Sequence, residues 1–183
     1  MSDFSCDVKE NIKRLETSLN VERNFDILQR EVVIAGRRAV FFFIDGFVQE
    51  DTVEKLIQFF YSLKESDMQS LDSFLEKGLP YTEVSRSSNI DNVITQFLSG
   101  VSIMTIDGFD ECLLIDCRTY PMRSVSEPWK DRVLRGSRDG FVETLVSNAA
   151  LLRRRIRDPR FSMELYGIGR RSRSDVAICY ISD

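Results

Sequence analysis

The sequence predicts an α/β protein with two small α/β subdomains and mixed sheets, the second subdomain being incomplete at its C-terminus. Stretches with helical spacing of apolar residues alternate with short apolar strands, and 43% of the side chains are hydrophobic against 30% charged. The chain has 183 residues, enough to bury the core of one or two small domains. We expect the first subdomain at 1–120, a connector at 121–138 and the start of the second subdomain at 139–183.

The first subdomain is expected to begin with an amphipathic helix and a hairpin. Apolar residues recur at helical spacing over residues 8–19, directly after Asp7, which can cap the helix. Residues 27–34 and 39–44 are typical of strands, and Gly36 lies at the turn between them. The second run is apolar throughout, which favours a strand buried on both faces of a sheet.

Further helices and strands are expected to complete this subdomain. Helical patterns follow Asp51, Asp67 and either Asn89 or Asp91. The second of these patterns ends before Gly78, and the third ends before Gly100. Residues 101–106 and 111–116 are then predicted to be paired strands.

The tetrapeptide Ile-Asp-Gly-Phe occurs twice, at residues 44–47 and 106–109, each time directly after an apolar strand. Asp-Gly tolerates the positive φ angles of tight turns. We therefore interpret both copies as turns, with a ligand-binding role as the alternative.

The second subdomain is expected to hold the clearest helix of the chain. Asp139 can cap it, Phe141 begins its apolar face, and it should run to about Arg157 before Pro159. Residues 161–166 and 175–181 are predicted to be strands. One helix and two strands cannot cover both faces of a sheet, which is why we expect an incomplete subdomain.

Charge divides the chain in the same way. Residues 1–130 hold 14 Lys and Arg against 22 Asp and Glu, a net charge of −8, whereas residues 131–183 hold 11 against 7, a net charge of +4. Arginines gather at Arg153, Arg154, Arg155, Arg157 and Arg160. These cations repel one another unless anionic groups pair with them. We favour carboxylates of the acidic first part as these partners. Phosphates of nucleic acid or of an anionic membrane are the alternative, although no aromatic residues interleave with the arginines, so nucleic acid is not expected as a partner.

The composition excludes much of enzymology. The chain has no histidine, which removes the usual general base, the Ser-His and Cys-His nucleophile pairs and every His-ligated metal site. The four cysteines lack Cys-x-x-Cys spacing, and Gly167 to Ser172 is only a partial dinucleotide fingerprint. We expect no cofactor, no metal and no enzymatic activity. The longest apolar run, residues 39–44, is far below the roughly 18 residues of a membrane-spanning helix.

An ordered set of motifs carries a family resemblance. They are Arg135-Gly-Ser-Arg-Asp-Gly-Phe141, Leu-Leu-Arg-Arg-Arg-Ile-Arg-Asp at 151–158, and Asp175-Val-Ala-Ile-Cys-Tyr-Ile181. In this order they resemble the GerA family, the A subunits of bacterial spore germinant receptors. The form of the first motif is most similar to the stage V sporulation branch of the family, because receptor A subunits more often have Pro and Glu at Ser137 and Asp139. Looser agreement, including Phe25-Asp26, extends the resemblance over roughly residues 24–183.

The resemblance implies a cytosolic N-terminal region of two α/β subdomains, followed in the whole protein by membrane helices in the spore inner membrane. It implies a role in spore germination, as an assembly and coupling module of an ion-conducting complex, and no member of the family is known as an enzyme. The expected partners are other subunits of the germination complex or copies of the same chain. Binding of a small-molecule germinant is the alternative function.

We expect a hinge and contact surface between the subdomains. The residues of this hypothesis are Arg135, Gly136, Arg138, Asp139, Gly140, Phe141, Arg153, Arg154, Arg155 and Arg157. Gly136 and Gly140 permit unusual backbone angles, and Asp139 can pair with Arg135 or Arg138. The alternative is that these residues only hold the fold together.

Overall fold

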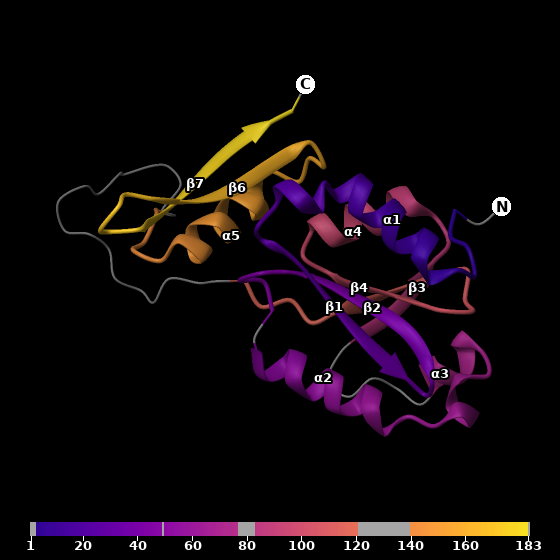
Figure 1. The fold of residues 1–183 in the computed structure, drawn as a ribbon. Helices are drawn as coiled ribbons and strands as arrows, with labels where there is room; N and C mark the ends of the chain where they lie inside the picture. Colours follow the sequence, from indigo (N-terminus) through magenta and orange to yellow (C-terminus); the bar gives the residue numbers. More distant parts are fainter. Residues whose placement is uncertain (1–2, 49, 77–82, 121–139, 183) are drawn as a thin grey trace, which may run out of the picture.

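A five-stranded sheet with the strand order β1-β2-β4-β5-β3 forms the centre of the first part of the chain (Figure 1). Its strands are β1 (Ile27–Ile34), β2 (Arg37–Ile44), β3 (Glu83–Ser87), β4 (Ser102–Ile106) and β5 (Cys112–Asp116). The computed structural model describes residues 3–48, 50–76, 83–120 and 140–182.

Two pairs of helices cover the two faces of this sheet (Figure 1). Helices α1 (Val8–Leu19) and α4 (Ile90–Leu98) pack on one face, and α2 (Glu50–Ser62) and α3 (Leu71–Glu76) pack on the other. Short 3-10 turns, η1 (Val21–Arg23) and η2 (Glu65–Met68), follow α1 and α2. The expected α/β class is confirmed.

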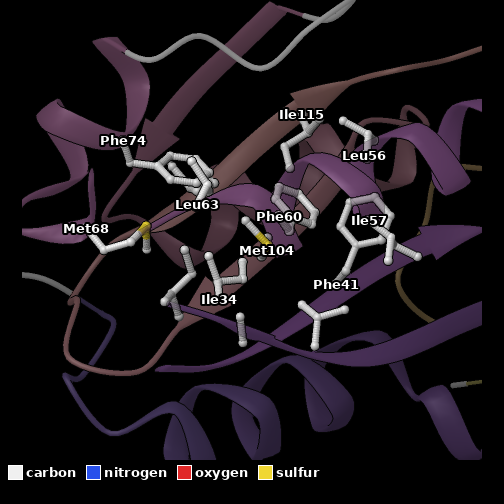
Figure 2. Close-up of a cluster of buried hydrophobic side chains, with 14 of the residues drawn as sticks. Ile34, Phe41, Leu56, Ile57, Phe60, Leu63, Met68, Phe74, Met104 and Ile115 are labelled. Carbon is white, nitrogen blue, oxygen red and sulfur yellow. The ribbon is translucent and has the colours of Figure 1, made fainter. Parts of the chain in front are cut away.

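Strand β2 separates two hydrophobic clusters. Ala39 and Phe41 pack toward α2 and α3, whereas Val40 and Phe42 pack toward α1 and α4, and all four are at most 1% exposed. Figure 2 shows the first of these clusters, in which the rings of Phe41 and Phe60 lie 6.5 Å apart. The prediction of a strand buried on both faces is confirmed.

Local signals explain where α1 and α4 begin. The Asp7 carboxylate accepts a hydrogen bond from the Lys9 amide at 2.9 Å, and the Asn89 side chain accepts one from the Asn92 amide at 2.8 Å. Asp7 is therefore the predicted cap of α1, and Asn89, of the two residues considered, caps α4.

Strand directions and strand number differ from the expectation. All pairings between named strands are antiparallel, whereas mixed sheets were expected. Strands β1 and β2, and likewise β4 and β5, are joined by short turns, which only antiparallel strands allow. The pairs β2–β4 and β3–β5 are antiparallel as well. Strand β3 carries no predictive signal in the sequence, because this edge strand is largely exposed and has no apolar run.

The second part contains α5 (Leu145–Arg155) and a hairpin of β6 (Phe161–Ile168) and β7 (Ser174–Ile181). Both strands were predicted, but the helix begins later than expected. The Asn148 side chain bonds the amide and the carbonyl of Val142, both at 2.7 Å, which closes a turn before the helix begins after Thr144. Phe141 accordingly lies before the helix and is 67% exposed, so it does not begin the apolar face.

The expected connector at 121–138 lies outside the described residues. Among the residues that are described, no helix combines the length and the apolar character that crossing a membrane requires.

Candidate functional site

The two copies of Ile-Asp-Gly-Phe form equivalent turns, but each turn contacts a different element. Gly46 and Gly108 have φ angles of 80° and 89°, and the Phe47 and Phe109 amides close the turns onto Ile44 and Ile106. A Cβ atom at Gly46 would lie 3.1 Å from the Cβ of Ala150, so the first copy is the surface on which α5 packs. The second copy instead receives the chain just before α1, because the Gly108 amide donates to the Cys6 carbonyl at 2.8 Å.

Arg153, in the last turn of α5, is fully buried and reaches into the first part of the chain. Its Nε and Nη2 atoms donate to the two carboxylate oxygens of Asp26, at 2.8 and 2.9 Å. Nη1 donates to the Phe161 carbonyl at 2.9 Å, and the guanidinium lies over the Phe161 ring at 4.9 Å. This bidentate, charge-assisted pair is the strongest geometry an arginine offers a carboxylate.

Asn24 completes the set of partners around the guanidinium. Its Oδ1 accepts from Arg153 Nη2 at 2.8 Å and from the Met163 amide at 2.9 Å. Its Nδ2 donates to the carbonyls of Leu19 and Asn20, at 2.9 and 3.0 Å. Every polar atom of this buried amide therefore has a partner, as a stable buried polar network requires.

The backbone reinforces this contact. The Phe25 amide donates to the Met163 carbonyl at 3.0 Å, and Asn24 and Met163 form an isolated parallel bridge. We call the set of Asn24, Asp26, Arg153, Phe161 and Met163 the junction. It ties the segment before β1, helix α5 and strand β6 into one buried network.

Arg154 makes a second, exposed contact with the first part. Its guanidinium lies 4.4 Å from the centre of the Tyr120 ring, a cation–π distance. The Tyr120 hydroxyl donates to the Ser99 carbonyl at 2.7 Å, and its ring meets Phe47 edge-on at 5.2 Å. The last described residue before the connector is thus held by the helix that follows the connector.

The predicted site residues divide into three groups. Arg135, Gly136, Arg138 and Asp139 lie outside the described residues. Gly140, Phe141, Arg155 and Arg157 are exposed, and a Cβ at Gly140 would meet nothing within 4 Å. Arg153 and Arg154 both contact the first part. The expected ion pair with a carboxylate of the first part is formed by Arg153, whose partner is Asp26.

Neither Asn24 nor Asp26 is among the site residues that the sequence predicts. Asp26 belongs to the Phe25-Asp26 motif of the family resemblance, and its partner Arg153 lies 127 positions away. Two buried polar residues just before an apolar strand leave no periodic pattern in the sequence. Only the net negative charge of the first part indicated that its carboxylates pair with the arginines.

A hollow of about 250 Å³ lies beside the junction, between η1 and β6. Its lining residues are Val21, Glu22, Arg23, Asn24, Phe25, Glu164, Leu165 and Tyr166. The hydroxyls of Tyr166 and Tyr180 donate to the Glu164 carboxylate, which lowers the pKa of Glu164. The hollow therefore offers a cation, a carboxylate that stays ionised, and aromatic side chains.

Of the cysteines, Cys112 and Cys117 are buried among packed side chains, whereas Cys6 and Cys179 are exposed. Cys112 is fully buried, and burial raises the pKa of its thiol. Over the described part of the chain, no three Cys, Asp or Glu side chains gather in the way that metal ligands do.

Comparison with known proteins places the chain among spore germination proteins. A family model described as Bacillus/Clostridium GerA spore germination protein matches residues 13–183. The chain is 31% identical over 176 residues to stage V sporulation protein AF of Bacillus subtilis (strain 168), which covers 95% of this chain and 36% of that protein. It is 28% identical over 162 residues to spore germination protein GerLA of Bacillus cereus, which covers 86% of this chain and 33% of that protein. The chain thus spans about a third of the length of these curated relatives.

One solved structure has the same fold. It is the N-terminal domain of the A subunit of the Bacillus megaterium spore germinant receptor GerK3, which matches with a TM-score of 0.75 and 21% identity. The match covers 99% of this chain and 66% of that one.

Proposed function

The chain belongs to the GerA family of spore germination proteins, and we propose that it is an assembly and coupling module of a germination complex. In this proposal it forms the N-terminal, cytosolic region of a longer protein of the spore inner membrane. Its partners are other subunits of the complex or copies of the same chain, and it acts without catalysing a reaction.

The observation that carries the proposal is the junction between Asp26 and Arg153. A module that transmits movement needs parts that are joined by defined contacts, and the junction fixes α5 and β6 to the sheet through four hydrogen bonds of one guanidinium. The exposed contact between Arg154 and Tyr120 adds a second point at which movement of α5 reaches the first part.

The side chains of this protein offer little that an enzyme would use for catalysis. The chain has no histidine, and the buried charged groups of the junction have internal partners rather than an open position for a substrate. We therefore propose a binding and coupling protein rather than an enzyme.

The test is the variant Arg154→Ala in the full-length protein in spores. Loss of the cation–π contact should weaken coupling without unfolding the core, because Arg154 is exposed. We expect slower germination and less co-purification of the complex subunits. The matched control is Arg160→Ala, which removes an exposed arginine that pairs with Asp158 in its own turn. Normal germination and normal assembly of the Arg154 variant overturn the proposal.

Binding of a small-molecule germinant is a second candidate function, favoured by the hollow that Arg23, Phe25 and Glu164 help to line. A ligand at 100 times its dissociation constant stabilises a protein by about 2.7 kcal/mol, which a thermal-shift screen of amino acids and sugars detects. The screen should be repeated on Arg23→Ala. A ligand that stabilises both proteins equally does not bind in this hollow.

A further inference from the structure

Helix α1 ends in a left-handed residue that is not a glycine. Asn20, the C-cap, has a φ of 49° and a ψ of 48°, and its amide donates to the Thr17 carbonyl at 3.3 Å. Glycine is the residue most often found in this conformation at the end of a helix, because it has no Cβ and therefore no steric strain there. The side chain that stands here in place of glycine makes a contact outside the helix.

That contact is with strand β6. Asn20 Nδ2 donates to Ser162 Oγ at 3.0 Å, across 142 positions of the sequence. Ser162 is fully buried, and it lies on the face of β6 opposite to Phe161 and Met163, because successive side chains of a strand point to opposite faces. Phe161 and Met163 pack with Ala149 of α5. Strand β6 is therefore held on one face by α5 and on the other by the end of α1.

The backbone of Asn20 also contacts the junction. Its carbonyl accepts a hydrogen bond from Asn24 Nδ2 at 3.0 Å. Asn24 Oδ1 in turn accepts from Arg153 Nη2 at 2.8 Å. A displacement of β6 or of the Arg153 guanidinium therefore acts on the last turn of α1.

The rest of α1 is attached to the far part of the sheet. The Val8 amide, in the first turn, donates to the Asp107 carboxylate at 3.3 Å, in the turn between β4 and β5. Asn11 Nδ2 donates to Thr105 Oγ1 of β4 at 3.1 Å, and both residues are fully buried. A helix of 12 residues is about 18 Å long, so α1 joins β6 to a distant turn of the first part.

We propose that α1 takes part in the coupling, and that Asn20 is the positioning residue through which α1 and β6 move together. The inference rests on the proposed function, because it names a further element through which movement of α5 and β6 reaches the first part. If Asn20 only capped α1, glycine would serve equally well. The bond to Ser162 is what distinguishes the two roles.

The first measurement is amide hydrogen exchange of the chain. Asn20→Gly keeps the left-handed backbone and removes the side-chain bond to Ser162. Loss of this bond should speed exchange in β6 roughly five-fold, while α1 keeps its protection. Ser162→Ala removes the acceptor and should have the same effect. The matched control, Thr17→Ala, removes a side-chain bond to the Lys13 carbonyl within α1 and should leave β6 unchanged.

The double variant Asn20→Gly/Ser162→Ala completes a mutant cycle. Its exchange in β6 should be no faster than that of either single variant, because one bond cannot be lost twice. Effects that add, or unchanged exchange in both single variants, would show that the two side chains act separately and overturn the proposal. Circular dichroism checks that each variant is folded. Ser162→Ala, which removes one buried hydroxyl, carries the test if Asn20→Gly does not fold.

Germination separates positioning from a structural role. In the full-length protein in spores, Asn20→Gly and Ser162→Ala should each slow germination while the complex subunits still co-purify, and Thr17→Ala should germinate normally. Faster exchange in β6 with normal germination would make the bond a structural contact only and overturn the proposal.

The outcome is distinguishable from that of the proposed function. A germination defect in Arg154→Ala without one in Asn20→Gly or Ser162→Ala supports coupling through α5 and removes α1 from it. Normal germination and normal assembly of Arg154→Ala, with a defect in Asn20→Gly, overturn the contact of Arg154 as the coupling point and leave α1 in that role. Normal germination of all three variants overturns both.

Discussion

Asp26 and Arg153 form an ion pair in which both side chains are 1% exposed. Removing two charges from water costs several kcal/mol for each ion, and the cost is offset only when the pair is well aligned and its other polar atoms are satisfied. Here Asn24 and the Phe161 carbonyl each accept one further guanidinium hydrogen. The pair therefore defines how α5 is placed more than it adds to net stability.

Truncation of one partner should be far more harmful than the net value of the pair suggests. Asp26→Ala leaves the Arg153 charge buried without its carboxylate, and we expect a loss of about 3 to 5 kcal/mol in the free energy of unfolding. Urea denaturation measures this loss. The control, Arg160→Ala, removes an exposed pair with Asp158 and should change stability little. A small effect of Asp26→Ala would mean that water reaches Arg153.

Glu164 gives the hairpin a pH dependence of predictable sign. Hydrogen bonds from Tyr166 and Tyr180 lower its pKa in the folded chain. Its stabilising contribution is therefore present above the pKa of the unfolded chain and is lost as the pH falls through the lower, folded pKa. Titration by nuclear magnetic resonance should give a pKa below the ordinary value of glutamate. In Tyr180→Phe the value should rise, and an unchanged value would contradict the role of the hydroxyl.

At the scale of elements, the two Ile-Asp-Gly-Phe turns show one local structure serving two contacts. Each follows a strand of the central sheet and each has a glycine with positive φ. The turn at Gly46 packs against Ala150 of α5, and the turn at Gly108 lies at the beginning of α1. Repeated turn chemistry therefore does not imply a repeated partner.

The contact with α5 predicts a difference between two glycine substitutions. Gly36 and Gly46 both have a φ of 80°, but only at Gly46 would a Cβ meet a neighbour, Ala150 at 3.1 Å. Gly36→Ala should cost about 1 to 2 kcal/mol from backbone strain alone. Gly46→Ala should cost more, because α5 must also shift. Denaturation of both variants tests this, and equal losses would show that α5 adjusts freely.

The elements that the sequence predicted well carry their signals within a few residues. Asp7 and Asn89 cap α1 and α4, and the run Ala39 to Ile44 indicated the buried strand at the centre of the sheet. Strand β3 lacked an apolar pattern. The start of α5 depends on the hydrogen bond between the Asn148 side chain and Val142, which composition and periodicity do not reveal. The capping role expected for Asp139 rested on residue type alone.

At the scale of the whole molecule, a pairing across 127 positions decides how the parts meet. Neither Asp26 nor Arg153 has a pattern that identifies the other, because the contact depends on how the chain is folded in between. The sequence indicated an acidic first part and a cationic helix end, and the structure pairs Arg153 with Asp26 of the first part, whereas Arg160 pairs with Asp158 of the second part. Choosing one carboxylate among 22 Asp and Glu of residues 1–130 required the structure.

The junction predicts which region opens first when it is broken. Helix α5 and strand β6 are held to the sheet by Arg153, by Ala150 and by the bridge between Asn24 and Met163, whereas β2 and β4 lie between two hydrophobic clusters. In Asp26→Ala, amide hydrogen exchange should therefore rise in α5 and β6 while β2 and β4 keep their protection. Hydrogen exchange with mass spectrometry resolves these segments. Equal acceleration in all four elements would mean that the two parts unfold as one cooperative unit, and the junction would then be a core contact rather than a joint.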